Sequence, residues 1–462
     1  MKKLLTTLAL TCTAALAQAQ VPGGLQARLQ HTLDSMAGKY HYKGLSAAVS
    51  YKNQGHWASA SGVSYAGKPL TADMLIGIGS NTKTFVSTLL LKFAESGQIS
   101  LTDTIGRWIQ GYNNIPGSIT LRQLLTHTSG LADYTTNPAY NTAVVANMYR
   151  MWTVPELLRD LVLPPVTTAG TTYKYCNTNY LVAGYIAEQV GGKPVYQLIR
   201  DSILTPQALH HTFMPPYETT TDEYAHFWND QYGTPALDDI ADWNTSGQGL
   251  PPQLNSSVQG AGAMVSTPED NVKFWKALMN GHIISKSTLQ NEMLQGSGFG
   301  TPASDYGLGI MRTKYLGNTV FQHGGTWIGQ INENMADTTN NIYITVLSNQ
   351  DSLKNDMVSR VVIALYKTAL QYTSALSVST VNLQQEIKCY PNPATDVLRF
   401  DGPQNEAYSI TVTDISGKQW LTQQLSTGGT GTIPVSQLPA GLYILSLHNA
   451  KGTIQTRFYV QH

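Results

Sequence analysis

One serine and one lysine stand three residues apart in the stretch GIGSNTKTF, which runs from Gly77 to Phe85. Residues at positions i and i+3 share one face of a helix, so Lys83 can reach the hydroxyl of Ser80 if a helix begins here. A lysine that is partly withdrawn from water loses its proton more easily and can then activate a hydroxyl as a nucleophile. The alternative is a serine at a helix start followed by a solvated lysine, and the pair alone does not decide between the two.

A second stretch, TTYKYCNTNY, places Tyr175 and Asn177 on either side of Cys176. A tyrosine near a lysine can carry a lowered pKa and relay a proton, while an amide can hold a substrate carbonyl. A tyrosine packed against its sheet is the alternative interpretation, and other tyrosines of the chain also stand two residues before an asparagine.

A third stretch is FQHGGTWIG, in which His323 ends a strand-like run and is followed by Gly324 and Gly325. The glycines after it let a substrate backbone approach the edge of the strand closely. The backbone N–H of Thr326 could then pair with that of Ser80 as an oxyanion hole. Taken in isolation, the segment is equally compatible with a bend at the edge of a sheet.

Other kinds of chemistry receive less support. The chain contains no G-x-S-x-G, no G-x-x-x-x-G-K-[ST] and no H-E-x-x-H, so an α/β-hydrolase, a nucleotide loop and a zinc protease are not indicated. His210 and His211 are interpreted as surface residues whose side chains diverge on a helix. Asp238, Asp239 and Asp242 are interpreted as a solvated loop rather than a cation site. No metal and no cofactor are therefore expected.

The amino-acid composition favours a protein that functions outside the cell. The chain has 462 residues, a formal net charge of zero and only 13% charged residues, about half the usual share. A neutral chain offers no electrostatic support for a nucleic-acid partner.

The N-terminus carries the features of a secretory leader. MKKLLTTLALTCTAALAQAQ has two lysines, an apolar run and then a small-residue cleavage pattern, so a signal peptide is predicted at 1–19. A membrane anchor is the weaker alternative because the apolar run is short. Cys176 and Cys389 lie in segments assigned to different domains, so a disulfide framework is not expected.

The order of periodic segments predicts an α+β domain over 20–372. Strand-like segments come first, at Ala47 to Asn53 and His56 to Gly67, and strand patterns return late in TVFQHGG and NIYITVLSNQ. Helical segments dominate the middle, and a long amphipathic helix follows the last strand, with an apolar face of Val358, Val361, Val362 and Leu365. This order suggests one antiparallel sheet built from both ends of the domain, with a helical insert between them.

The last part of the chain has a different texture. A linker is predicted at 373–385, followed at 386–462 by short alternating runs separated by turns, which indicates a small β-sandwich. This tail resembles the C-terminal sorting domain of the type IX secretion system in YPNPA, ITVTDISGK, LPAGLYIL and RFYV. The resemblance implies export through that secretion machinery to the exterior or surface of a Gram-negative cell, by way of the periplasm. A generic carbohydrate-binding or adhesive sandwich is the alternative.

The three chemical stretches occur in the order Ser-x-x-Lys, Tyr-x-Asn and His-x-Gly, which is far more specific than any one alone. Together with LTDTIGRWI, ITLRQLLTHTSGLADY, YKYCNTNYLVAGYIAEQVGGK, GAGAMVSTPEDNVKF and YGLGI, they make the domain similar to one superfamily. It resembles the serine hydrolases of the class C β-lactamase and D,D-peptidase superfamily, including its esterase and D-aminopeptidase branches. The resemblance implies a β-lactamase/transpeptidase-like fold, an antiparallel sheet flanked by helices with a helical lobe, and a site between sheet and lobe.

The resemblance also implies roles for individual residues. Ser80 becomes the acylated nucleophile, Lys83 helps to activate it, Tyr175 is the proton shuttle and Asn177 contacts the substrate amide. The reaction implied is acyl transfer through a tetrahedral oxyanion and an acyl-enzyme, followed by hydrolysis.

The sheet-edge wall would consist of His323, Gly325 and Thr326, with N–H groups of Ser80 and Thr326 as the oxyanion hole. His323 stands where dedicated β-lactamases and carboxypeptidases of the superfamily carry lysine. A histidine is charged only in part near neutrality, so it suits a β-lactam or terminal carboxylate less well.

Three further departures from the superfamily pattern do not touch the proposed chemistry. Cys176 replaces a small residue, Ala169 stands where proline is common, and Gln207-Ala208 interrupts a Pro-Leu-Gly phrase. The stretch from Tyr217 to Gln259 does not align with the superfamily pattern and is expected to form a wall of the pocket that influences substrate choice.

The sequence therefore predicts a secreted serine hydrolase that acts on a small peptide, amide or ester. A peptidase or esterase is favoured over the alternative of a true class C β-lactamase. The other alternative is a surface binding protein that keeps the fold without turnover.

Overall fold

The structure is a computed structural model of the chain, and it forms two compact units, Met1–Tyr372 and Thr373–His462. Each unit is described by itself. The residues that the structure describes are 20–229, 238–240, 251–301, 304–351, 358–376, 387–401, 408–414, 418–425, 430–449 and 452–462. The predicted signal peptide at 1–19 lies outside these ranges.

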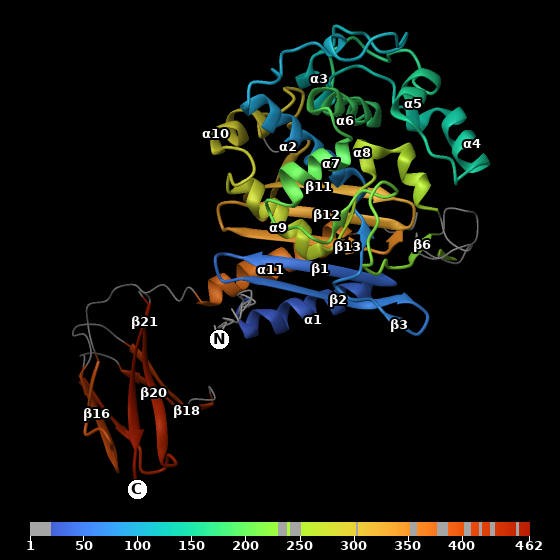
Figure 1. Ribbon diagram of the computed structural model, residues 1–462. Coiled ribbons are helices and arrows are strands. Elements are labelled where there is room, and N and C mark those ends of the chain that lie inside the picture. The colour runs from blue at the N-terminus through green and yellow to red at the C-terminus, as the bar shows by residue number, and fades with distance from the viewer. Residues whose placement is uncertain are drawn as a thin grey trace, which may run out of the picture. The chain divides into compact units, whose positions relative to one another are not determined.

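The described part of the larger unit is built on an eight-stranded antiparallel sheet (Figure 1). Its order is β3-β2-β1-β13-β12-β11-β10-β9, so the first strands of the chain join the last strands at the centre. The strands are β1 (Gly44–Tyr51), β2 (His56–Tyr65), β3 (Lys68–Pro69), β9 (Asp305–Tyr306), β10 (Met311–Tyr315), β11 (Asn318–Trp327), β12 (Gln330–Asp337) and β13 (Ile342–Ser348). The prediction of one antiparallel sheet built from both ends of the domain is confirmed.

The central strands β1 and β13 are buried at every position, because layers of helix cover both faces of the sheet. Their register pairs Leu45 with Ser348 and Tyr51 with Ile342. The serines and tyrosines of these strands are buried like the apolar residues, since both faces of the strands are covered.

Two helices cover one face of the sheet, α1 (Gly23–Tyr40) and α11 (Val358–Leu376) (Figure 1). In α1 the buried residues recur every four positions, which turns one stripe toward the sheet. The predicted apolar face of α11 is buried as expected, with Leu365 at 0% exposure, and it shares a core with α1 and the strands. The helix continues to Leu376, so it extends into the predicted linker.

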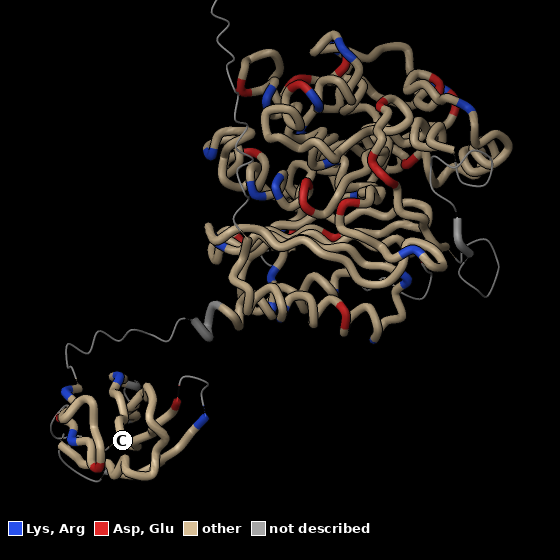
Figure 2. The backbone as a smooth tube through the Cα atoms, turned by 60° about the horizontal axis from the view of Figure 1, so that its bottom comes forward, with Lys and Arg blue, Asp and Glu red and all other residues tan. Residues whose placement is uncertain are grey.

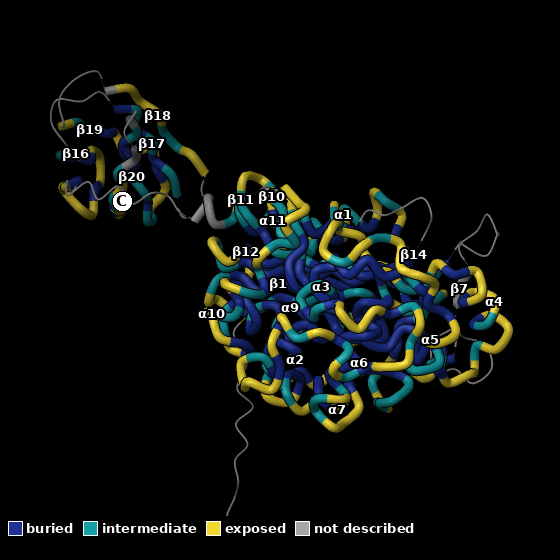
Figure 3. The backbone as a smooth tube through the Cα atoms, turned by 90° about the horizontal axis from the view of Figure 1, so that it is seen from above, coloured by how far each residue is buried: buried dark blue, intermediate teal, exposed yellow. Residues whose placement is uncertain are grey.

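The other face carries α9 (Pro268–Met279), which packs on β1, β12 and β13, and above it a mainly helical lobe (Figure 1). Buried positions gather in the sheet and in the helices nearest to it (Figure 3). The lobe's α-helices are α2 (Thr82–Glu95), α3 (Leu121–Leu125), α4 (Pro138–Ala146), α5 (Val154–Asp160), α6 (Asn177–Gly191), α7 (Val195–Ile199), α8 (Gln259–Gly262) and α10 (Lys286–Thr288).

Short 3₁₀ and π turns and small strands complete this unit. The turns are η1 (Gly79–Asn81), η2 (Ile105–Arg107), η3 (Tyr134–Thr136), η4 (Arg200–Leu204), η5 (Pro252–Ser257) and η6 (Leu289–Met293). Two small sheets have the orders β4-β8-β5 and β14-β6-β7 within the described ranges. Their strands are β4 (Ile76–Gly77), β5 (Thr212–Phe213), β6 (Phe227–Asn229), β7 (Asp238–Ile240), β8 (Val265–Ser266) and β14 (Gln350–Asp351).

The smaller unit is all β, and its described strands form two sheets with the orders β15-β16-β19 and β18-β17-β20-β21. Its core includes Leu398, Phe400, Leu445 and Phe458. The strands are β15 (Lys388–Tyr390), β16 (Val397–Asp401), β17 (Tyr408–Asp414), β18 (Gln419–Leu425), β19 (Thr430–Pro434), β20 (Gly441–Asn449) and β21 (Gly452–Val460). The prediction of an all-β tail is confirmed.

Charged residues of both signs are scattered over the larger unit (Figure 2). None of the described helices combines the length and the apolar character that crossing a bilayer requires.

The packing of α11 predicts a large loss of stability when its buried face is truncated. Leu365→Ala should lower the free energy of unfolding of the larger unit by about 2–5 kcal/mol, because it leaves a cavity between helix and sheet. Urea unfolding followed by circular dichroism measures this loss. The control Lys367→Ala, at an exposed position of the same helix, should change it by less than about 0.5 kcal/mol. Equal effects of the two substitutions would contradict the assigned face.

Candidate active site

Ser80 lies in the 3₁₀ turn η1, between strand β4 and helix α2, and this turn packs directly on strand β11. A Cβ on Gly325 would lie 2.0 Å from Ile78 O and 2.6 Å from Ser80 N. A Cβ on Gly79, whose φ is +46°, would lie 2.9 Å from the backbone nitrogen of Thr326. Both glycines are needed because the two backbones touch here, which holds Ser80 against the sheet edge.

Lys83, in the first turn of α2, is completely buried, with 0% exposure. Its Nζ lies 2.9 Å from Ser80 Oγ, 2.8 Å from Asn177 Oδ1 and 2.6 Å from Ala261 O. Burial lowers the pKa of Lys83 to about 7, and the nearby Asp133 carboxylate opposes this shift. The predicted approach of Lys83 to Ser80 is present in the structure.

These three neighbours suit either charge state of the lysine. A charged ammonium has three N–H donors, one for each acceptor. A neutral amine keeps two N–H groups for Asn177 Oδ1 and Ala261 O, and its lone pair then faces the hydroxyl of Ser80. The arrangement can therefore take a proton from Ser80 without moving either side chain.

Asn177, at the start of α6, is oriented by Asp133, a residue to which the sequence analysis assigns no role. Asp133 Oδ2 accepts hydrogen bonds from Asn177 N at 2.9 Å and from Asn177 Nδ2 at 3.1 Å. Because a carboxylate only accepts, it fixes the NH₂ end of the amide on itself and turns the oxygen toward Lys83. The phrase LADY contains Asp133, but nothing local indicates its partner.

Tyr175 lies next to this pair, with Lys83 Nζ 5.0 Å from the centre of its ring. The sequence-based expectation of a lowered pKa is wrong. Although 36% of the residue is accessible, burial raises the pKa of the Tyr175 phenol, and its interaction with the Ser80 hydroxyl only partly opposes this. Tyr175 is therefore a neutral phenol, which can relay a proton through its hydroxyl but does not act as a phenolate.

His323, on β11, carries less positive charge than the partial charge near neutral pH that the sequence analysis expects. Its Nδ1 donates to Gly324 O at 2.6 Å, so Nε2 is free to accept from the hydroxyl of Tyr306 at 3.0 Å. Burial and the neighbouring Lys83 lower the pKa of His323 to about 3. Both ring nitrogens are thus engaged within the protein, and this strand edge carries no positive charge from His323 near neutral pH.

His127, from the phrase LLTHTSG, is a second buried histidine that the sequence analysis does not single out. Its Nδ1 accepts from Cys176 N at 3.1 Å, and its ring lies 4.2 Å from that of Tyr175 and 4.8 Å from that of Tyr306. Burial, Lys83 and His323 lower the pKa of His127 well below its usual range. His127 is therefore a neutral ring that packs against the ring of Tyr175.

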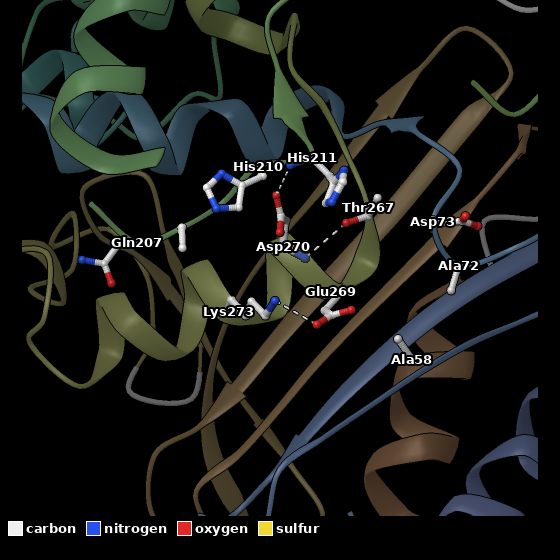
Figure 4. Close-up of a pocket in the computed structure, with 11 residues that line it drawn as sticks. Ala58, Ala72, Asp73, Gln207, His210, His211, Thr267, Glu269, Asp270 and Lys273 are labelled. Atoms are coloured by element: carbon white, nitrogen blue, oxygen red, sulfur yellow. Dashed lines mark hydrogen bonds and ion pairs between the residues drawn. The ribbon is translucent and has the colours of Figure 1, made fainter. Parts of the chain in front are cut away.

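The cavity at Ser80 has a volume of about 300 Å³ and is lined by Ser80, Tyr175, Met311, His323, Gly325 and Thr326, among others. A larger cavity, of about 680 Å³, lies on another part of the unit (Figure 4). It is lined by charged and polar residues such as His210, His211, Glu269 and Lys273, and none of its lining residues belongs to the Ser80 cavity.

His210 and His211 are exposed, as expected, but the helix predicted for them is absent. His210 and His211 lie on a turn rather than a helix, and His211 donates its N–H to Asp270 Oδ2 at 2.7 Å. None of the described residues of 217–259 lines the Ser80 cavity, although 230–237 and 241–250 lie outside the described ranges.

The structure places two of the cysteines and two of the aspartates considered in the sequence analysis. Cys176 and Cys389 are free. Asp238 and Asp239 belong to β7, and Asp242 lies outside the described residues. Within the described ranges, no group of three or more His, Cys, Asp or Glu side chains is arranged to hold a metal ion.

Comparison with known families agrees with this fold and site. A family profile described as Beta-lactamase matches residues 25–366, so the chain belongs to the beta-lactamase family. A second profile, described as Secretion system C-terminal sorting domain, matches residues 388–461. Both family resemblances are confirmed.

The relatives that the chain matches include penicillin-binding proteins and putative D-alanyl-D-alanine carboxypeptidases. The chain is 26% identical to the putative penicillin-binding protein PbpX of Bacillus subtilis over 279 residues, 58% of this chain and 62% of the relative. It is 30% identical to a putative D-alanyl-D-alanine carboxypeptidase of Escherichia coli O157:H7 over 155 residues, 32% of this chain and 35% of the relative. The chain thus spans less than two thirds of the length of these curated relatives.

Among solved structures, the fold is similar to a D-stereospecific amidohydrolase from Streptomyces sp., with a TM-score of 0.64 and 28% sequence identity. The match covers 74% of this chain and 98% of that one.

The pKa of Lys83 predicts how the reactivity of Ser80 depends on pH. Because only the neutral amine can take the hydroxyl proton, labelling of Ser80 by a fluorophosphonate should accelerate as pH rises, with a midpoint at about 7. The pKa values of His127 and His323 are lowered below this range, so neither accounts for the midpoint. Stopped-flow or quenched labelling, corrected for the reagent's own hydrolysis, measures the profile. A rate that is flat between about pH 5.5 and 8.5 would contradict this role of Lys83.

The contacts of Asp133 predict a defect with two signatures. Asp133→Asn removes charge-assisted hydrogen bonds worth about 1.5–3 kcal/mol, so labelling of Ser80 should slow by about ten- to a hundredfold. It should also move the midpoint of the pH profile to lower pH, because the carboxylate raises the pKa of Lys83. The control Asp160→Asn, at an exposed ion pair of the same lobe, should change neither quantity. A slower rate with an unmoved midpoint would indicate a purely structural role for Asp133.

Proposed function

We propose that the chain is a serine hydrolase that cleaves a peptide, amide or ester through an acyl-enzyme on Ser80. The observation that carries this proposal is the buried amine of Lys83, 2.9 Å from Ser80 Oγ and with a pKa lowered to about 7. Burying an ammonium group costs free energy, because its charge is better solvated by water. A lysine with a purely structural role would therefore be expected to remain exposed. Membership of the beta-lactamase family supports the same chemistry.

The first half of the reaction follows from the positions of three groups. Lys83 Nζ takes the hydroxyl proton as Ser80 Oγ bonds to the substrate carbonyl carbon, and the carbonyl electron pair moves onto its oxygen. The N–H groups of Ser80 and Thr326, on the two backbones that touch at Gly79 and Gly325, stabilise that oxyanion. Asn177 holds Lys83 in place and can contact the substrate amide.

The second half returns the proton. When the tetrahedral intermediate collapses, the bond to the leaving group breaks, and the leaving group receives the proton of Lys83 through the hydroxyl of Tyr175. Water then attacks the Ser80 ester with Lys83 and Tyr175 again moving one proton, and the acid product and free Ser80 are released.

The neutral state of His323 favours substrates without a carboxylate beside the scissile bond. Its two ring nitrogens are engaged by Gly324 O and the Tyr306 hydroxyl, so His323 offers neither a charge nor a donor to such a group. This favours amide or ester cleavage over β-lactam hydrolysis, and the amidohydrolase from Streptomyces supports an amide.

The site of action that we propose is outside the cell. The sorting-domain match at 388–461 and the predicted signal peptide at 1–19 support export through the periplasm and the type IX secretion machinery. The mature enzyme would then be secreted or held at the surface of a Gram-negative bacterium.

Covalent labelling tests the nucleophile. Intact mass spectrometry after treatment with a fluorophosphonate should show one adduct on the protein and none on Ser80→Ala. Turnover should be faster for p-nitrophenyl esters and D-amino-acid amides than for nitrocefin, because the strand edge lacks a cation. Absence of an adduct, or an adduct that persists in Ser80→Ala, would refute the nucleophile. Faster turnover of nitrocefin would support the β-lactamase alternative instead.

A further inference from the structure

A small cavity with aromatic walls adjoins the Ser80 cavity. It has a volume of about 140 Å³, and its principal walls are Tyr173, Phe299, Tyr306 and the thioether of Met311. Met311 lines both this cavity and the one that contains Ser80, so the two cavities are neighbours. No step of the reaction described above uses the smaller cavity.

The polar residues of this cavity support its walls. Asp305 Oδ1 accepts from Ser297 N at 3.2 Å, from Ser297 Oγ at 2.8 Å and from Tyr306 N at 2.8 Å. A Cβ on Gly300 would lie 2.5 Å from Asp305 Oδ1, so the loop passes directly over the carboxylate. Asp305 thus ties the loop that carries Phe299 to strand β9.

One wall of this cavity, Tyr306, lies beside Tyr175. The ring of Tyr306 lies 5.8 Å from that of Tyr173 and 6.1 Å, edge-on, from that of Tyr175. Tyr175 is the residue that passes a proton to the leaving group in the proposed reaction. A group that leaves past the Tyr175 hydroxyl therefore has this aromatic wall beside it.

The size and lining of the cavity define what it can hold. An apolar cavity of about 150 Å³ accommodates a benzene ring, so a cavity of about 140 Å³ matches one phenyl-sized group. Phe299 is 46% exposed and Tyr173 is 36% exposed. Covering such exposed aromatic surface with an apolar group removes it from water and so favours binding.

We propose that this cavity is a subsite for a phenyl-sized apolar group on the leaving side of the scissile bond. The inference rests on the proposed function and narrows its substrate class to esters or amides whose leaving alcohol or amine carries such a group.

Paired esters test the subsite. Ethyl acetate and benzyl acetate share an acyl group and differ in the leaving alcohol, whereas ethyl acetate and ethyl phenylacetate share a leaving group and differ in the acyl part. Followed in a pH-stat, kcat/KM should favour benzyl acetate over ethyl acetate by about tenfold or more. Phe299→Ala should reduce that preference by about threefold or more, since the ring forms one wall of the cavity. The control Tyr149→Ala, at a residue with 62% exposure outside both cavities, should leave the preference unchanged.

The outcomes separate this inference from the proposed function. Labelling of Ser80 without a preference for the benzyl leaving group, or a preference that Phe299→Ala does not reduce, overturns the subsite and leaves the proposed function standing. A preference for the phenyl group on the acyl side alone also overturns the assignment. Absence of Ser80 labelling overturns both.

Discussion

The burial of one amine, Lys83 Nζ, is the constraint on which the rest of the site depends. An ammonium inside a protein is costly, and here Ser80, Asn177 and Ala261 each present an oxygen to it. These partners come from η1, α6 and α8, so the cost is offset only when three segments distant in sequence are assembled together. The remainder of the cost appears as a lowered pKa, and the assembly of the lobe thereby brings the pKa of the proposed base to about 7.

The sheet and the lobe contribute different properties to the site. The lobe supplies the groups that we propose exchange a proton; Asp133 orients Asn177, and the ring of His127 packs on that of Tyr175. The sheet supplies the backbone of β11 and the ring of His323, whose two nitrogens contact Gly324 O and the Tyr306 hydroxyl. The joint between the two layers is the contact at Gly79 and Gly325, where no side chain fits. The side chains proposed to exchange a proton thus come from outside the sheet, and the edge of strand β11 lines the Ser80 cavity.

Features that depend on local spacing could be predicted from the sequence. The approach of Lys83 to Ser80 follows from an i, i+3 relation, and the buried face of α11 follows from its period. Features that depend on tertiary surroundings could not be predicted. Asp133 meets Asn177 across 44 positions, and the Ala261 carbonyl meets Lys83 across 178. The pKa of Tyr175 was expected to fall because a cation is near, yet burial, which no local pattern reveals, raises it.

The pairing of β1 with β13 has a consequence for the order in which the molecule can assemble. Leu45 finds its partner only at Ser348, so closing this pair joins points about 300 residues apart along the chain. The strand that packs against Ser80, β11, is equally late in the chain. During synthesis or passage through a membrane pore, the first strand therefore waits with one edge open, and no reactive serine is assembled until nearly the whole unit has emerged. In a hydrolase that carries a sorting domain, the closure of these late strands therefore sets the earliest point at which Ser80 can be held against β11.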